Sequence, residues 1–383
     1  MRTRICKDTG TIASADWNAL LADSNPFLRH EFLHALETSG CAAADEGWQT
    51  QHILCEEDDG QLIGALPLYL KDNSQGEFVF DFSWASAYHQ AGLRYYPKLV
   101  SAVPFTPATG NRLLLSPGLD EKTSNQTARK LIEAATDLAR EYNASSLHIL
   151  FPTVRDKELL VDNDLLIRKD CQFHWHNHGY ADFDHFLEGF TSSKRKKTKR
   201  ERRRIAENGI QFEVKTGHDM NEALWDELMP LYNTTFLRRG RMPYLNREFF
   251  LAITNTLPDN LVVFMGREGD ELVAVAICFR SDDTLYGRYW GANRFIDSLH
   301  FETCYYQGID FCIREKLRCF EPGTQGEHKI SRGFVPTETW SAHWLSHPQF
   351  AVAIDDFLQR ERGHIDSYMD VVNEHIPYKK AQD

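Results

Sequence analysis

Residues 260–292 read NLVVFMGREGDELVAVAICFRSDDTLYGRYWGA, and this stretch decides the fold. Three apolar runs are separated by short polar turns at 268–270 and 281–283. Runs of this length that are rich in Val, Ile, Phe and Tyr are typical of strands, and turns this short join antiparallel neighbours. The stretch therefore predicts a three-stranded antiparallel sheet. Residues 300–316 follow it with the apolar spacing of a helix.

The first half of the chain has the same order of segments. Residues 48–83 predict a hairpin with its turn at 58–60 and a third strand around EFVFDFSWA (77–85), and residues 123–142 predict a helix. The repeated pattern indicates an α+β (mixed α/β) protein of two similar domains. We expect them at 1–165 and 166–383, the second including a basic linker helix at 192–207.

The composition is that of a soluble globular protein. The chain has 383 residues, of which 42% are hydrophobic and 26% charged. No apolar run reaches the ~20 residues that a membrane helix needs, and the N-terminus lacks the apolar core of a signal peptide, so we expect a cytoplasmic protein. The 8 cysteines are scattered without a CxxC pair, which predicts free thiols rather than disulfides or a cysteine-based zinc site.

A dense basic run interrupts a chain whose net charge is −12. It reads SKRKKTKRERRRIAENG over residues 193–209. Such a density of like charge predicts an anionic partner, such as the phosphates of RNA, of a nucleotide or of a lipid head group. The alternative is a solvated helix face paired with acidic residues of the same protein. The candidate anion-binding residues are Lys194, Arg195, Lys196, Lys197, Lys199, Arg200 and Arg203.

The second candidate is the loop 320–334, FEPGTQGEHKISRGF. Its Pro and Gly residues exclude a regular helix or strand, so the segment predicts a shaped loop. A loop that gathers an acid, an imidazole and two cations suits proton transfer beside an anion. The alternative is a polar turn with internal ion pairs. We expect Glu327 or His328 as a base, and Lys329, Arg332 and Gln325 as substrate-binding residues.

Two further segments carry candidate residues. His300 and Glu302 open the helix at 300–316, where Glu302 is a reserve base or only a helix-start charge, and Trp290 ends the preceding strand. Arg238 and Arg239 follow a predicted helix at 221–237, either as a clamp for a carboxylate or phosphate or as compensation of the helix dipole.

The motif HWHNH places His174, His176 and His178 on one face of a predicted strand. Metal ligands could share a face in this way, but such a face is more often a polar, hydrogen-bonded one. No carboxylate completes the local pattern, so we predict no metal site.

Four long stretches resemble the FemAB-like family of peptidoglycan biosynthesis/recognition proteins, which are predicted N-acyltransferases. They are residues 25–37 (NPFLRHEFLHALE), 168–210, 288–313 (RYWGANRFIDSLHFETCYYQGIDFCI) and 320–344. The resemblance implies two tandem GNAT-like domains. Fem-type relatives move an amino acid from aminoacyl-tRNA to an amine, and the basic run resembles the helix that links their domains.

The resemblance therefore implies an N-acyltransferase whose donor is aminoacyl-tRNA or acyl-CoA and whose acceptor is an amine. Acetyl-CoA-dependent GNAT proteins carry a glycine-rich pyrophosphate loop, whereas residues 293–299 (NRFIDSL) contain no glycine, which argues against ordinary acetyl-CoA use. A protein that only binds RNA or an anionic envelope precursor is the alternative from another class. The sequence leaves the oligomeric state open.

Overall fold

The computed structural model describes residues 1–324 and 326–379, and the chain divides into two compact units. The first unit comprises Met1–Asp170 and Glu338–Asp366, and the second comprises Cys171–Thr337 and Ser367–Asp383. The first division lies close to the expected domain boundary at 165. The segment Glu338–Asp366 differs from the expectation, because it belongs with the N-terminal part of the chain and not with the second domain.

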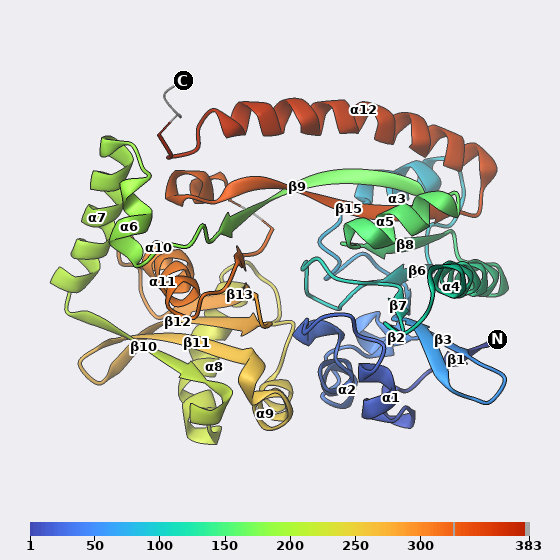
Figure 1. The fold of residues 1–383 in the computed structure, drawn as a ribbon, viewed down its shortest axis with the longest axis horizontal. Helices are drawn as coiled ribbons and strands as arrows, with labels where there is room; N and C mark the ends of the chain where they lie inside the picture. The colour runs from blue at the N-terminus through green and yellow to red at the C-terminus, as the bar shows by residue number, and fades with distance from the viewer. Residues whose placement is uncertain (325, 380–383) are drawn as a thin grey trace. The chain divides into compact units, whose positions relative to one another are not determined.

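The first unit contains two sheets (Figure 1). A small sheet has the order β1-β3-β4-β7, and a second group of strands has the order β15-β8-β6-β5-β2. The strands are β1 (Arg2–Cys6), β2 (Gln49–Thr50), β3 (His52–Glu56), β4 (Leu62–Leu66), β5 (Tyr69–Lys71), β6 (Lys98–Ser101), β7 (Leu114–Leu115), β8 (Ser146–Leu150) and β15 (Val335–Leu345). The helices are α1 (Ser14–Asn18), α2 (His30–Thr38), α3 (Phe82–Gln90), α4 (Glu121–Glu141) and α5 (Val154–Asp162).

The core of the first unit forms because α4 buries an apolar face against the strands. Leu131, Ala135 and Leu138 of α4 pack with Ile53 of β3 and Leu147 of β8. A second cluster joins Trp84 of α3 to Ile354 and Leu358 of the long helix α12 (Pro348–Asn373). Glu338–Asp366 therefore contributes both a strand and an apolar helix face to this unit.

The predicted strand at 77–85 is wrong, because α3 begins at Phe82 and no strand is assigned at 77–81. Glu77 and Asp81 both bind the buried Lys98 ammonium, with Glu77 at 2.8 Å. Residues four apart in a strand lie about 13 Å apart, so an extended segment could not bring both carboxylates to one ammonium. The aromatic and Val residues of 77–85 favour a strand, but the buried ion pairs of Lys98 with Glu77 and Asp81 require a non-extended backbone here.

The second unit is built on a mixed sheet with the order β10-β11-β12-β13-β14-β9 (Figure 1). Its strands are β9 (Leu166–His176), which enters from the first unit, β10 (Ile210–Thr216), β11 (Leu261–Glu268), β12 (Glu271–Arg280), β13 (Thr284–Ala292) and β14 (Cys319–Glu321). The predicted three-stranded meander is confirmed by the antiparallel pairs β11–β12 and β12–β13. β13 and β14 are parallel neighbours, from Thr284 opposite Cys319 to Tyr286 opposite Glu321.

Helices cover both faces of this sheet, with α8 and α9 on one face and α11 on the other (Figure 1). Trp225 of α8 stacks on Phe250 of α9 at 4.7 Å between ring centroids, whereas Ile309 and Cys312 of α11 enter the opposite core. The helices are α6 (Phe183–Glu188), α7 (Ser192–Glu207), α8 (Glu222–Leu237), α9 (Arg247–Thr256), α10 (Leu299–Phe301) and α11 (Gln307–Arg314), with a π-helical segment η6 (Glu302–Tyr306) and a 3-10 segment η7 (Glu327–Arg332).

Two expectations from the sequence concerned disulfide bonds and membrane-spanning helices. The eight cysteines all lie within the described residues and are free thiols, as the sequence predicts. Among the described residues, no helix is both long and apolar enough to cross a membrane.

Candidate active site

The basic run forms helix α7, as predicted, and its two faces differ in chemistry. Thr198, Glu201 and Ile205 are buried, at the spacing of one helix face, while most of the cations face solvent. The first turn holds no acidic residue, and the N-cap Thr191 makes no capping bond. Cations at a helix N-terminus oppose the helix dipole, so this end of α7 is suited to an anion rather than to helix stability.

The cations of α7 fall into two groups. Those toward the C-terminal half are paired: Lys199 with Asp184 at 2.7 Å, Arg203 with Glu207 at 3.4 Å, and Arg204 with Asp297. Lys197 lies 3.9 Å from Glu201. Four cations of α7 have no ion-pair partner within the part of the chain that the structure describes: Lys194, Arg195, Lys196 and Arg200.

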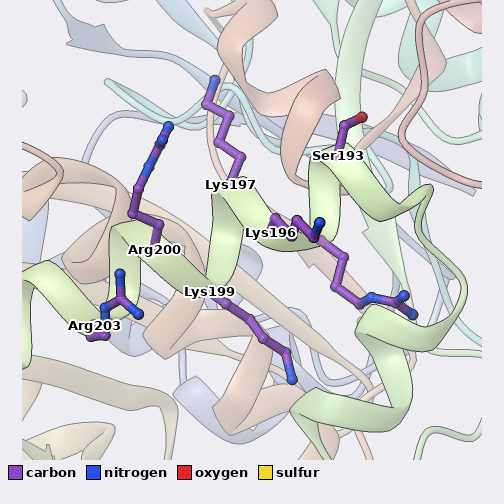
Figure 2. Close-up of a pocket in the computed structure, with 7 residues that line it drawn as sticks. Ser193, Lys196, Lys197, Lys199, Arg200 and Arg203 are labelled. Atoms are coloured by element: carbon purple, nitrogen blue, oxygen red, sulfur yellow. The ribbon is translucent and has the colours of Figure 1, made fainter.

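A hollow of about 500 Å³ follows the exposed side of α7 (Figure 2). Figure 2 shows that Lys197 and Arg200 extend to one side of the helix and Lys199 to the other. Because every lining residue belongs to this one helix, the hollow is an open surface between side chains and not an enclosed pocket. It brings together all predicted anion-binding residues except Lys194; its lining is Ser193, Arg195, Lys196, Lys197, Lys199, Arg200 and Arg203.

The buried Glu201 joins α7 to two other segments, and we call this contact the Glu201 junction. Both Glu201 oxygens accept hydrogen bonds from Arg332 Nη2 at 2.9 Å, and Oε2 accepts another from the Tyr306 hydroxyl at 2.5 Å. Arg332 Nη1 donates to the His328 carbonyl oxygen at 2.6 Å. Arg332 also lies over the Phe301 ring, 3.3 Å from its centroid. The inner face of α7 is thus connected directly to the loop that carries His328.

Beside this junction lies a group of rings that we call the ring cluster, made of Trp290, His300, Phe301, Tyr305 and His328. The His300 ring lies 4.6 Å from Trp290 and 5.7 Å from His328 between centroids. The Tyr305 hydroxyl is 2.8 Å from His328 Nε2. The structure therefore brings together three predicted residues, Trp290, His300 and His328, from segments nearly 40 positions apart.

Both imidazoles of the ring cluster favour the neutral form. Burial lowers the pKa of His300 to about 4, with further contributions from His328 and nearby cations. The pKa of His328 is also lowered, by burial first and then by Arg332 and Lys329. Burial raises the pKa of Tyr305, so its hydroxyl keeps its proton. In the tautomer in which His328 Nε2–H donates to the Tyr305 oxygen, Nδ1 is the ring nitrogen that keeps a lone pair. His328 is exposed to solvent, and in this tautomer its neutral imidazole can accept a proton at Nδ1.

Glu302, the reserve base, lies in the π-helical segment η6 and is buried. Its Oε1 accepts hydrogen bonds from Arg202 at 3.2 Å and from Gln307 at 2.8 Å. Burial raises the pKa of Glu302, against the opposing effect of Arg202. π-Helical turns often occur at functional sites, but the contacts of this carboxylate tie it to α7 rather than to the ring cluster. Arg202 also binds Asp310 at 2.7 Å.

Lys329 and Arg332, the two cations of η7, both donate hydrogen bonds to other groups of the protein. Lys329 is 1% exposed and its ammonium donates to the Gly323 carbonyl oxygen at 2.6 Å. Burial lowers the pKa of Lys329 to about 7. Arg332, 2% exposed, is held in the Glu201 junction. Both side chains are therefore placed to shape the loop, and direct binding of a substrate by either stays a prediction. Gln325 lies outside the described residues.

The remaining predicted residues lie at the edge of this region. Glu327 is exposed and accepts a hydrogen bond from the Tyr368 hydroxyl at 3.0 Å. Arg238 donates to the Ala292 carbonyl oxygen at 3.3 Å, and the nearby charge of Arg239 contributes to the lowered pKa of His300. Both arginines follow α8 and are exposed.

The structure adds Glu201, Arg202 and Tyr305 to the predicted set. Glu201 is the one acid among the cations of residues 199–204 (KRERRR), and that exception was the available signal. Tyr305 reads as a packing residue in the sequence, because nothing local indicates that its hydroxyl meets a histidine 23 positions later.

Segment 293–298 is held by side-chain contacts. Asn293 donates to Glu271 at 2.6 Å, Arg294 pairs with Glu271 at 3.1 Å, and Phe295 is 90% exposed.

Solved structures share the fold of this chain. FemX aligns with a TM-score of 0.54 at 12% identity over 93% of this chain and 100% of its own. A conserved protein of unknown function from Bacteroides thetaiotaomicron aligns with a TM-score of 0.52 at 12% identity, covering 89% of this chain and 99% of its own. The C-terminal domain of a putative lysylphosphatidylglycerol synthetase from Agrobacterium fabrum gives 0.50 at 12% identity, over 85% and 95%.

These likenesses confirm the predicted fold class, a mixed α+β protein with two GNAT-like units. Among curated proteins, none matches the sequence. The FemAB-like family, described as peptidoglycan biosynthesis/recognition, matches residues 8–380 and so nearly the whole chain. The chain therefore belongs to the FemAB-like family.

Proposed function

We propose that this protein transfers an aminoacyl group from aminoacyl-tRNA to an amine acceptor. The observation that carries the proposal is that the two faces of α7 make different contacts. Its outer face holds four cations without ion-pair partners among the described residues, which suits RNA phosphates, and its inner face contacts the loop of His328 through Glu201. One helix thus stands between an anion-binding surface and the ring cluster. A tRNA-linked donor would place the reaction in the cytoplasm.

The reaction requires proton transfer at the attacking amine. The amine nitrogen attacks the ester carbonyl carbon of the donor, a C–N bond forms, and the C–O bond to the ribose breaks. The amine loses one proton and the departing ribose oxygen gains one. A positioned base and acid therefore suffice, and the chain needs to supply no redox group.

We assign the base to His328. Its lowered pKa keeps the imidazole neutral at neutral pH, and its exposed side can meet an amine. Tyr305 orients the ring through the 2.8 Å hydrogen bond, and Arg332 fixes the backbone through the His328 carbonyl oxygen. In this proposal Arg332 is a positioning residue. Glu327 and Glu302 remain alternative bases, and a loss of activity in their glutamine variants but not in His328→Gln would move the role to them.

The acceptor and the aminoacyl group would lie against the ring cluster. Trp290 and His300 offer two adjacent rings, inclined to each other by 58°, and Arg238 and Arg239 supply exposed positive charge beside them. We propose these four as substrate-binding residues. The charge of the two arginines favours an acceptor that carries a carboxylate or phosphate.

The test is a binding and transfer experiment on the purified protein. Aminoacyl-tRNA, uncharged tRNA and acyl-CoA are titrated at two salt concentrations, and amide formation is followed with a set of amines. Preference for aminoacyl-tRNA, a steep salt dependence and loss of amide product in His328→Gln would support the proposal. Equal binding of both tRNAs without any product would indicate a binding protein. Binding of acyl-CoA alone would move the donor to coenzyme A.

A further inference from the structure

We propose that His174, Cys319 and Glu321 form a binding site for a divalent transition metal, with zinc as the ion that their donor atoms fit best. The site lies within the second unit, on strands β9 and β14. It is independent of the acyl donor and of the acceptor.

The strand register puts the three side chains on one face. β9 and β14 pair antiparallel, with Cys319 opposite His176 and Phe320 opposite Trp175. The next position along brings Glu321 opposite His174, and side chains opposite each other in a sheet point to the same face. Phe320 and Trp175 occupy the other face, in the apolar core.

The donor atoms of the three residues converge. One donor atom from each residue lies within 4.8 Å of the other two. His174 is 5% exposed, and Cys319 and Glu321 are half-buried. His176 shares the face but is not part of this group. The sequence alone offered no carboxylate near HWHNH, and the fold supplies both a thiol and a carboxylate from about 145 positions away.

The donor set matches zinc. Zinc accepts imidazole nitrogen, thiolate sulfur and carboxylate oxygen, and sites with three protein ligands keep a fourth position open. A thiolate and a carboxylate would together neutralise a divalent ion. Gln172 Oε1 lies 3.2 Å from His174 Nε2, an outer contact that can hold the ring while its other nitrogen binds the metal.

The protonation states without a metal are compatible with loading. Burial lowers the pKa of His174 to about 3, so its imidazole is neutral and available. Burial raises the pKa of the Cys319 thiol, so metal binding must release its proton. The competing explanation of the cluster is that Glu321 serves to balance the buried Arg288, whose pKa is lowered by burial against the opposing effect of this carboxylate.

The second group of potential ligands in the described chain is less suited. Asp8, His34 and Glu37 converge in the first unit, but Glu37 already accepts hydrogen bonds from the Thr9 amide and from the hydroxyls of Thr9 and Thr50.

The experiment uses the full-length protein, stripped with a chelator, loaded with Zn²⁺ or Co²⁺ and dialysed. We expect one equivalent of metal by mass spectrometry and a thiolate-to-metal charge-transfer band with Co²⁺. Cys319→Ser should abolish the band, and Cys319→Ser and His174→Gln should each weaken binding by more than about 100-fold, beyond the loss typical of outer contacts.

Two variants control for thiol and imidazole content. Cys171→Ser removes a half-buried thiol of the opposite face of β9, and His178→Gln removes an exposed imidazole beyond the strand; both should keep the metal. Metal content far below one equivalent, or an unchanged Co²⁺ band in Cys319→Ser, would overturn the proposal. If that variant fails to fold, the absence of a thiolate band in the unaltered protein would overturn it equally.

Discussion

At the residue scale, the cations of α7 are not equivalent, because some are already neutralised within the protein. Lys196 has no ion-pair partner among the described residues, whereas Lys199 pairs with Asp184 at 2.7 Å. We expect Lys196→Ala to weaken tRNA binding and to reduce the slope of log affinity against log salt by about 0.7 to 0.9 for each lost phosphate contact. Lys199→Ala should change the slope less. Salt titrations of both variants test this, and equal slopes would refute the distinction.

His328 gives a second prediction at this scale. Because its pKa lies below the ordinary value of 6.5, the base is neutral at pH 7 and becomes protonated only in more acidic solution. The transfer rate should therefore be lost as pH falls through this lowered pKa. His328→Gln should remove the acidic limb of the profile and reduce the rate by about 10² to 10⁴.

Tyr305→Phe is the companion variant, since it removes one oxygen while keeping the ring. It should shift the acidic limb, because the Tyr305 hydroxyl is hydrogen-bonded to His328 Nε2. A profile identical to that of the unaltered enzyme would show that the Tyr305–His328 contact does not set the protonation of the base.

At the scale of elements, the Glu201 junction ties α7 to η6 and η7. Glu201→Gln leaves the buried Arg332 without a carboxylate, and an uncompensated buried charge costs about 3 kcal/mol. We expect this loss in denaturant unfolding, together with a lower rate of transfer. Glu207→Gln is the matched control on the same helix, because Glu207 is exposed and contacts Arg203 at 3.4 Å. It should change stability by less than about 0.5 kcal/mol.

Elements were predictable where the signal is local. The basic helix was expected at 192–207 and α7 covers Ser192–Glu207, because the end of the helix is marked by Asn208 and Gly209. The contacts that make a site were not predictable, since Glu201 and Arg332 are 131 positions apart and no periodicity links them. The predicted loop differs from the expectation for this reason. His328 is exposed to solvent, whereas Lys329 and Arg332 already donate hydrogen bonds to the Gly323 carbonyl oxygen and to Glu201.

At the scale of the whole molecule, the two units do not follow the linear order of the chain. β15 pairs with β8, and Leu345, Ile354 and Leu358 complete an apolar cluster of the first unit. A fragment of residues 1–165 should therefore fail to fold, because it exposes β8 and the partners of Trp84. Supplying 338–366 through a linker should restore a cooperative unfolding transition. Circular dichroism of both fragments decides this, and a stably folded 1–165 would contradict it.

The first unit should also respond to acid. His148 and His343 are fully buried with Nδ1 atoms 2.6 Å apart, and burial lowers the pKa of His148 to about 3 and that of His343 well below its ordinary value. The unfolded chain thus binds more protons between pH 6.5 and 3, so stability is full above pH 6.5 and falls toward pH 3. The slope reaches about 1.4 kcal/mol per pH unit for each histidine. Unfolding at several pH values tests this, and a flat profile would contradict it.

The return of Glu338–Asp366 to the first unit has a consequence for biosynthesis. A chain emerging from the ribosome presents residues 1–170 first, yet β8, which pairs with β6, must wait for β15 to be translated before it gains its second neighbour. Residues 171–337 emerge in the meantime and can begin to collapse. Domains usually fold in the order of synthesis, from the N-terminus onward. Here the unit that begins first is completed only after most of the second unit has emerged, and during that interval its unsatisfied strand edge is a target for chaperones.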